Sequence, residues 1–147
     1  MARLENWQSN LSQLISDKRE QPFDFPTWNC LMWAIDGVIA VTGNDYGKDY
    51  RGKYQNELGA SKILKKYYEV DTCQEFLEKH LNNEAKPIAF ARNGDIVLTN
   101  DPELSPTDIK LFGFVPGICY GATSFFVGEF GLIQIETLRL GSAIWVS

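Results

Sequence analysis

Apolar residues recur with the period of a helix near the start of the chain. One helical face collects Leu4, Trp7, Leu11, Leu14 and Ile15. Charged and polar residues occupy the other faces, so the pattern predicts an amphipathic helix within residues 1–20 that packs on the rest of the protein.

The next segment is apolar around most of a helix circumference. Prolines hold residues 22–26 in extended or turning backbone, because proline and the residue before it disfavour helix. A helix is therefore expected from Trp28 to Ala40, with Thr27 or Asn29 as its N-cap. A helix with so little polar surface is predicted to be buried.

Tyrosine and charged residues alternate over residues 45–55, which predicts a short helix or an ordered loop at the surface. Apolar residues then return at helical spacing. Two further helices are expected, one from Gly59 to Tyr68 and one from Thr72 to Leu81.

Beyond Pro87 the chain changes to short runs of β-branched and aromatic residues separated by glycine, proline and aspartate, a pattern typical of strands. The expected strands are Asp95–Thr99, Leu111–Tyr120, Thr123–Val127, Leu132–Thr137 and Ala143–Val146. Pro116 has no N–H for the ladder, so it is expected to place part of the second strand at a sheet edge or in a bulge.

Helices in the first half and strands in the second predict an α+β fold, in which N-terminal helices pack on a C-terminal antiparallel sheet. A length of 147 residues suits one domain with one proper core. The expected single domain covers residues 1–147, with a helical half at 28–83 and a sheet half at 88–147.

The charge of the chain narrows the classes of partner. The formal net charge is −5, and without a basic stripe the chain is not expected to bind nucleic acid. No apolar run approaches the roughly 20 residues that cross a bilayer, and the start of the chain lacks the pattern of a signal peptide. Neither a membrane span nor a signal peptide is therefore expected.

Cysteine usage argues against a metal site. Cys30, Cys73 and Cys119 make an odd number without zinc-ligand spacing, so they are expected to be reduced thiols. The aspartates do not form a calcium-binding loop. No metal and no cofactor are predicted.

Cys30 is the main candidate for chemistry, because it falls in the first turn of the predicted buried helix. There the helix dipole and free backbone N–H groups favour a thiolate, an arrangement that resembles papain-like peptidases. Alternatively Cys30 is a small buried hydrophobe, as many cysteines are. His80, the single histidine, is expected at the surface or half-buried on a helix and is a poor candidate for the base, because geometry must bring a base to its nucleophile.

Aromatic and basic residues offer a candidate binding surface. It consists of Tyr46, Tyr50, Arg51 and Tyr54, together with Trp28 and Asn29 beside the cysteine. Tyrosine and arginine are common at interface hot spots. Equally, Arg51 could pair with Asp45 or Asp49 and brace this loop over the cysteine helix.

Several segments together carry a family resemblance. They are Pro22 to Cys30, Thr42 to Asp45, Tyr50 to Tyr54, Gly59-Ala60, Asn93 to Val97, Gly131 to Ile133 and Ala143 to Trp145. Over nearly the whole chain they resemble a phage and prophage protein family of uncharacterised function. That family is similar to the NlpC-like cell-wall peptidases of phage tail tips, which implies a papain-like architecture.

The chain departs from the pattern of active enzymes at the positions that matter for catalysis. Asn29 stands where the enzymes usually carry an acid, and Trp28 where the phage family commonly has histidine. Val115 stands where the general-base histidine belongs. Because a cysteine nucleophile needs an activating base, the resemblance implies a catalytically degenerate domain that acts as a structural or adaptor component of a phage tail or of its assembly.

Two other functions remain open on the sequence. One is an active cysteine hydrolase that cleaves peptide or amide bonds of peptidoglycan, with Cys30 as nucleophile. The other is an unrelated binding domain. The resemblance implies other phage tail or baseplate proteins as partners, with peptidoglycan as a possible substrate, and a location in the virion tail or in the host cytoplasm during assembly.

Overall fold

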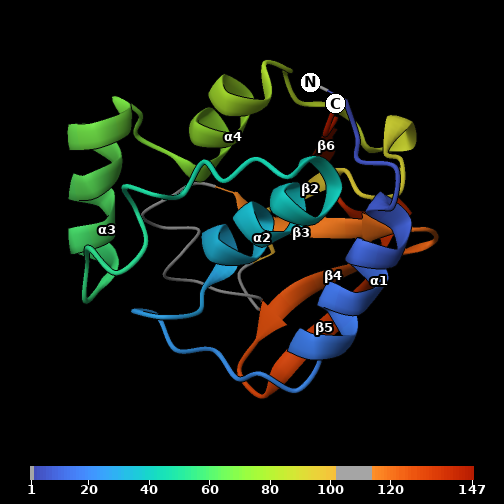
Figure 1. Cartoon of the computed structure of the whole chain (residues 1–147), viewed down its shortest axis with the longest axis horizontal. Helices are drawn as coiled ribbons and strands as arrows, with labels where there is room; N and C mark the ends of the chain where they lie inside the picture. The colour runs from blue at the N-terminus through green and yellow to red at the C-terminus, as the bar shows by residue number, and fades with distance from the viewer. Residues whose placement is uncertain (1, 102–113) are drawn as a thin grey trace.

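The computed structural model describes residues 2–101 and 114–147, with helices layered in front of a sheet (Figure 1). Helix α1 (Trp7–Lys18) buries Leu11 and Ile15 and leaves its polar face to solvent. The amphipathic helix expected at the N-terminus is thus confirmed.

The later part of the helical half agrees with the periodicity of the sequence. Helix α3 (Glu57–Ile63) continues into a π-helical turn, η1 (Leu64–Tyr68). Helix α4 (Cys73–Leu81) begins after Thr72, whose hydroxyl accepts a hydrogen bond from the Glu75 N–H at 3.0 Å. Figure 1 shows α3 at the side of the molecule, away from the sheet.

The second half forms a six-stranded antiparallel sheet in the order β1-β6-β2-β3-β4-β5. The strands are β1 (Lys86–Pro87), β2 (Ile96–Thr99), β3 (Val115–Tyr120), β4 (Thr123–Gly128), β5 (Gly131–Glu136) and β6 (Ser142–Ile144). The expected α+β class is confirmed, and each expected strand is present with slightly different ends. The start of the strand expected at Leu111–Tyr120 lies outside the described residues, and β1 was missed because two residues show no alternation.

Pro116 fits the expectation that part of its strand lies at an edge. It lies in β3, which runs between β2 and β4, but residues 115–117 pair with β2 alone, so this part of the strand has an open edge on the β4 side. The Cys119 N–H donates to the Asp95 carbonyl on the β2 side at 2.9 Å, so strand alternation turns the Pro116 nitrogen toward β4. The β3–β4 ladder begins only at Ile118. Proline is tolerated inside the sheet because its missing N–H falls where β3 has no ladder partner.

Helix α2 (Cys30–Thr42) is the buried helix that the apolar pattern predicted, and it packs directly on the sheet. A Cβ atom on Gly37 would collide with the Ile118 side chain of β3. The Trp33 indole N–H donates to the Phe125 carbonyl of β4 at 2.8 Å. These two contacts, one near the start of α2 and one near its middle, fix the position of the helix on the sheet.

Successive strand residues point to opposite faces of the sheet and belong to two separate apolar clusters. Those on the helix side include Ile96, Leu98, Ile118, Phe125 and Ile144. Those on the other face include Val97, Cys119, Phe126 and Ala143, which pack with Leu140. The turns η2 (Ile88–Phe90) and η3 (Thr137–Arg139) contribute to this second face, so both sides of the sheet are partly covered.

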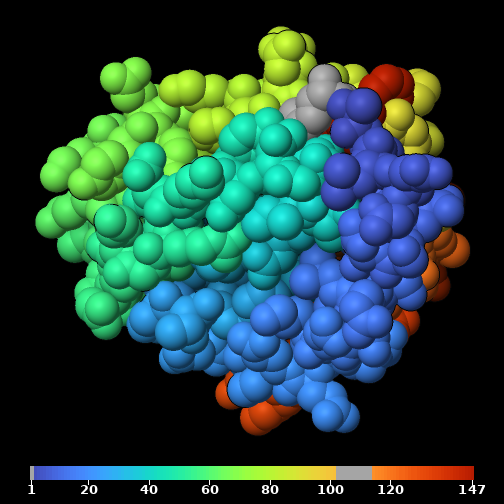
Figure 2. Space-filling model, viewed as in Figure 1, coloured from blue at the N-terminus to red at the C-terminus, as the bar shows by residue number. Residues whose placement is uncertain are grey.

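Residues 43–56 form an ordered loop that runs from the end of α2 back toward its start. Figure 2 shows this turquoise-to-green segment across the middle of the face, between α1 and α3. The expected surface position is wrong for Tyr50 and Tyr54, which are 0% and 4% exposed. Their rings bury apolar area beneath the loop while the charged residues between them remain accessible to water.

Candidate functional site around Cys30

Asn29 caps α2 and connects three segments. Its Oδ1 accepts hydrogen bonds from the N–H groups of Leu31 and Met32, each at 3.1 Å. Its Nδ2 donates to the Phe25 carbonyl at 2.9 Å and to the Tyr54 hydroxyl at 2.6 Å. The side chain is fully buried, and one of the two expected caps is confirmed.

The contacts of Asn29 explain why an amide suits this position. An aspartate could accept the two helix N–H groups equally well, but an ionised carboxylate has no hydrogen to donate. It would leave the Phe25 carbonyl without the donor that Nδ2 now supplies, whereas the Tyr54 hydroxyl can donate its own hydrogen to a carboxylate. The helix N–H groups therefore call for an acceptor at this position, and the Phe25 carbonyl calls for a donor.

Cys30 is the first residue of α2, as the sequence predicted, and only 2% of its surface is exposed. It belongs to the second apolar cluster together with Val97, Val115 and Phe126. The position at a helix start favours an anionic group. The burial works against chemistry with a substrate, because the sulfur has little contact with solvent.

Val115 lies in the same cluster as Cys30. It opens β3 opposite Thr99 of β2 and is 1% exposed. Its side chain can neither accept nor donate a proton. The residue that the sequence places at the position of a base is thus an inert part of the packing near Cys30.

His80 occupies a different environment in α4. Its ring stacks on Tyr46 at 4.8 Å between centroids and contacts Tyr68 and Phe76 at 5.3 and 4.6 Å. Burial, and secondarily the neighbouring Lys79 charge, lowers the pKa of the imidazole. The prediction of a half-buried helix residue is confirmed, and the cluster around Cys30 does not include His80.

Two tyrosines lie beneath the loop close to the start of α2. Tyr50 and Tyr54 have ring centroids 4.5 Å apart, and the Tyr54 ring meets Phe25 edge to face at 5.5 Å. Burial raises the pKa of Tyr54 and raises that of Tyr50 well above its usual value. Both phenols are therefore neutral at physiological pH, and neither can serve as a ready base.

Arg51 holds the loop against α2. Its Nη2 lies 3.1 Å from an Asp36 carboxylate oxygen and 3.4 Å from one of Asp45. Asp45 was one of the two expected partners; the other, Asp49, instead donates its backbone N–H to the Tyr68 hydroxyl. Burial raises the pKa of Asp36, and the Arg51 charge opposes that rise. The structure supports bracing as the role of Arg51.

The candidate binding residues do not make one exposed patch. Trp28 and Asn29 are buried beside Cys30, as are Tyr50 and Tyr54 beneath the loop. The Lys18 ammonium lies 5.0 Å from the Trp28 ring centroid and covers it from α1. Four of the six residues proposed for this surface are therefore buried and contribute to the interior of the protein.

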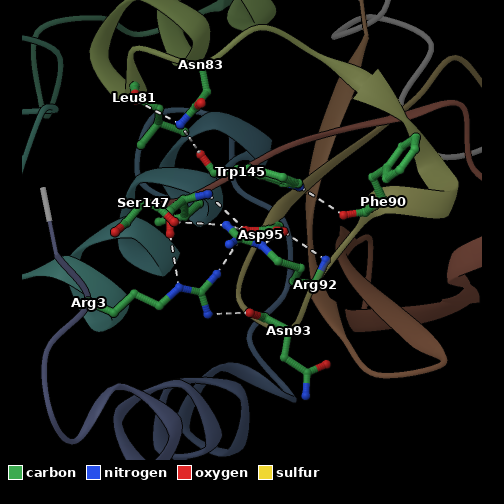
Figure 3. Close-up of polar contacts among 10 residues, drawn as sticks. Arg3, Leu81, Asn83, Phe90, Arg92, Asn93, Asp95, Trp145 and Ser147 are labelled. Atoms are coloured by element: carbon green, nitrogen blue, oxygen red, sulfur yellow. Dashed lines mark hydrogen bonds and ion pairs between the residues drawn. The ribbon is translucent and has the colours of Figure 1, made fainter.

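Asp95 is the most densely bonded side chain near the chain ends (Figure 3). It is 0% exposed. It accepts hydrogen bonds from the Arg92 backbone and guanidinium at 2.8 to 3.1 Å and from the Val146 N–H at 2.9 Å. Arg3 Nη2 lies 2.9 Å from the same carboxylate. The sequence analysis identified neither arginine as a partner of Asp95.

The arginines around Asp95 join the first and last segments of the described chain. Arg3 also donates to the carbonyls of Asn93 and Val146 at 2.6 and 3.1 Å, and Arg92 donates to the Ser147 carbonyl at 2.9 Å. Arg92 was visible as a basic residue three positions before an aspartate in a turn. Arg3 lies 92 positions away in the sequence, and nothing in the local pattern points to it.

The described residues support no metal centre. Within residues 2–101 and 114–147, no group of three or more His, Cys, Asp or Glu side chains could hold a metal ion. All three cysteines are buried thiols, and burial raises the pKa of Cys119. In this part of the chain every helix is too short or too polar to cross a membrane.

Comparison with known proteins gives one family. The model of a family described as "Domain of unknown function (DUF6950)" matches residues 2–145. No curated protein and no solved structure matches the chain.

Proposed function

Because the chain belongs to the DUF6950 family, whose function is unknown, its role must come from its own residues, and we propose a phage tail or tail-assembly component. In this proposal the domain is NlpC-like, has lost catalysis and acts as a structural adaptor. The phage and NlpC-like parts of this proposal come from the family resemblance of the sequence segments around Cys30 and Asp95.

The order and packing of elements support an NlpC-like domain. A cysteine begins a buried helix that follows an aromatic-rich loop and packs on an antiparallel sheet. Gly94 and Asp95 precede β2, and β3, β4 and β5 then follow as neighbouring strands. These features support the proposed NlpC-like architecture.

Loss of catalysis rests on one observation: Cys30 and Val115 share an apolar cluster of the described residues and are 2% and 1% exposed. A base near the nucleophile is needed to activate it, and Val115 provides none. The single histidine of the chain, His80, packs against the rings of Tyr46, Tyr68 and Phe76, none of which belongs to the Cys30 cluster. The geometry therefore favours a packing role for Cys30.

An adaptor role draws support from an exposed aromatic end of the molecule. Phe130, in the turn between β4 and β5, is 86% exposed, and Phe23 is 37% exposed. The Phe23 N–H donates to the Gly128 carbonyl at 3.2 Å, so the two aromatic residues belong to bonded segments. Exposed aromatic side chains of this kind are common anchors in protein interfaces.

The alternative is an active peptidoglycan hydrolase with Cys30 as nucleophile. The start of α2 favours this reading, because a helix N-terminus stabilises a thiolate. The Cys30→Ser variant separates the two roles. An adaptor keeps its activity in phage infection when the variant folds, whereas a hydrolase loses it.

The adaptor role is tested by tail association in the phage that encodes the chain. Phe130→Ser should reduce the amount of protein in purified tails by about tenfold, because hot-spot aromatics carry much of an interface's binding energy. Leu138→Ser is the matched control, since Leu138 is an apolar residue 76% exposed on η3. Absence of the wild-type protein from purified tails and from tail-assembly intermediates would refute the proposal.

A further inference from the structure

The two edges of the sheet differ in how they are protected. Strand β1 is one edge; it has only two residues, Lys86 and Pro87. Strand β5 is the other edge, at the lower end of the sheet in Figure 1, and it pairs with β4 residue for residue along its length. Protein edges are usually blunted by shortness, proline, lysine or a bulge. Strand β1 has three of these features, whereas β5 has none of them.

The free part of the β5 edge is a short window. The Leu132 N–H donates to the Arg19 carbonyl at 2.9 Å, on the side away from β4. Because strand residues alternate, the backbones of Gln134 and Glu136 also face outward. Among the described residues, no hydrogen bond reaches these outward groups. Arg19 closes one end of the window, and the turn η3 after Glu136 closes the other.

Water can satisfy an exposed strand edge, so the free groups alone do not indicate a partner. The pattern of the window does, because it is complementary to itself. When two copies pair in antiparallel fashion about Ile135, Gln134 of each copy lies opposite Glu136 of the partner subunit. Each such pair can exchange both backbone hydrogen bonds. The exposed Gln134 amide can also donate to the Glu136 carboxylate opposite it.

Other antiparallel registers fit less well. Pairing about Gln134 would place Glu136 opposite Leu132 of the partner subunit, whose N–H is already bonded to Arg19. Pairing about Glu136 would place two carboxylates directly opposite each other, which is destabilising. Pairing about Ile135 avoids both conflicts. It also brings together two half-buried Ile135 side chains on the face of the second apolar cluster.

We propose that β5 pairs with β5 of a second copy of this chain, antiparallel and centred on Ile135, so that the two sheets become continuous. The same surface then contacts itself across a twofold axis. Only a strand edge is covered, well below the roughly 1,600 Å² of a standard interface, so we expect a dissociation constant of about 100 μM. The pairing does not depend on the role in tails proposed above.

Sedimentation velocity of the purified chain, from about 10 μM to about 1 mM, tests the association. We expect the mass to rise from monomer to dimer. Glu136→Pro should weaken the dimer by at least about tenfold, because proline removes the outward N–H and its ring blocks the edge. The φ angle of Glu136, −57°, suits proline. Glu136→Ala is the matched control; it keeps the N–H and should weaken the dimer only about twofold.

Disulfide cross-linking tests the register. In this pairing the two Ile135 residues form a non-hydrogen-bonded pair with Cα atoms about 4.5 Å apart, which suits a disulfide. Ile135→Cys should therefore cross-link two copies on mild oxidation. Ile133→Cys is the control on the same strand face and is equally half-buried. It should not cross-link, because the two copies of residue 133 would lie about 13 Å apart along the strands. The native cysteines are buried, so the wild type should stay uncross-linked.

The outcomes separate this inference from the adaptor role. A chain that stays monomeric at about 1 mM, a Glu136→Pro dimer as stable as the wild type, or equal cross-linking at residues 133 and 135 would overturn the β5 pairing. A dimer of a chain that never enters tails would overturn only the proposed function. A monomeric chain that is found in tails would leave the adaptor role intact and remove the dimer.

Discussion

Single buried polar groups decide the local structure around the cysteine. Asn29 uses both ends of its amide, accepting from the helix and donating to two other segments. His80 shows the opposite case: its Nε2 is buried and has no hydrogen-bond partner among the described residues. The first arrangement stabilises the fold, and the second makes stability depend on protonation.

Replacing Asn29 by aspartate tests the need for a donor. We expect Asn29→Asp to lower the free energy of unfolding by about 2 kcal/mol at pH 7, because a carboxylate would be buried and the Phe25 carbonyl would lose its donor. Asn56→Asp is the control. Asn56 caps α3 at the surface, where its side chain accepts a hydrogen bond from the Gly59 N–H and donates no buried one. Urea unfolding measures both; equal stability of the two variants would contradict the role of Nδ2.

The lowered pKa of His80 predicts a pH dependence. Because the folded chain favours the neutral imidazole, the unfolded chain binds the proton more readily, and stability present above about pH 6.5 is lost as the pH falls. We expect urea unfolding between pH 7.5 and 5.5 to show this loss in the wild type. His80→Phe should flatten the dependence while keeping the aromatic packing. The same slope in both proteins would assign the effect to other groups.

At the scale of elements, hydrophobic periodicity predicted most helices and strands. It failed where contacts between residues distant in sequence determine which side chains are buried. Residues 45–55 look like a charged surface loop, yet Tyr50 and Tyr54 are buried because they pack against α2. Strand β1 has two residues and too little sequence to show a pattern. Around the candidate site, Cys30 and its cap Asn29 were predictable, whereas the burial of the thiol depends on strands from the other half.

Close packing of α2 on β3 gives a prediction at this scale. Gly37→Ala should destabilise the protein by about 1 to 2 kcal/mol although alanine favours helix, because the new methyl group meets the Ile118 side chain. Ile118→Val removes the colliding methyl group. In the double mutant the cost of Gly37→Ala should fall, which a double-mutant cycle of urea unfolding measures. Simple additivity would show that the two residues are not in tight contact.

At the scale of the whole molecule, the hydrogen bonds and ion pairs around Asp95 hold the two ends of the described chain together (Figure 1). The resemblance included the segment from Asn93 to Val97 but gave no sign of Arg3, because a salt bridge between distant segments leaves no local pattern. The network combines a fully buried carboxylate with arginines that remain partly exposed. Its contribution should therefore be smaller than that of a fully buried ion pair.

Asp95→Asn tests whether this network holds the two chain ends together. We expect a loss of about 2 to 3 kcal/mol in the free energy of unfolding, because two arginines lose their counter-charge and one amide group must replace several accepted bonds. Asp71→Asn is the matched control, since its pair with Lys65 is exposed on both sides and should be worth less than about 0.5 kcal/mol. Similar small losses in both variants would show that Asp95 does not hold the ends together.

The central claim, that Cys30 is a packed core residue and not a nucleophile, is tested most directly by its alkylation. Iodoacetamide reactivity is measured from pH 5 to 9 on Cys73→Ala/Cys119→Ala protein, after its fold has been verified. We predict slow modification that becomes rapid only on unfolding, because Cys30 is 2% exposed. Rapid alkylation of the folded protein, with an apparent pKa well below the usual value of about 8.5, would contradict the account and favour a cysteine hydrolase.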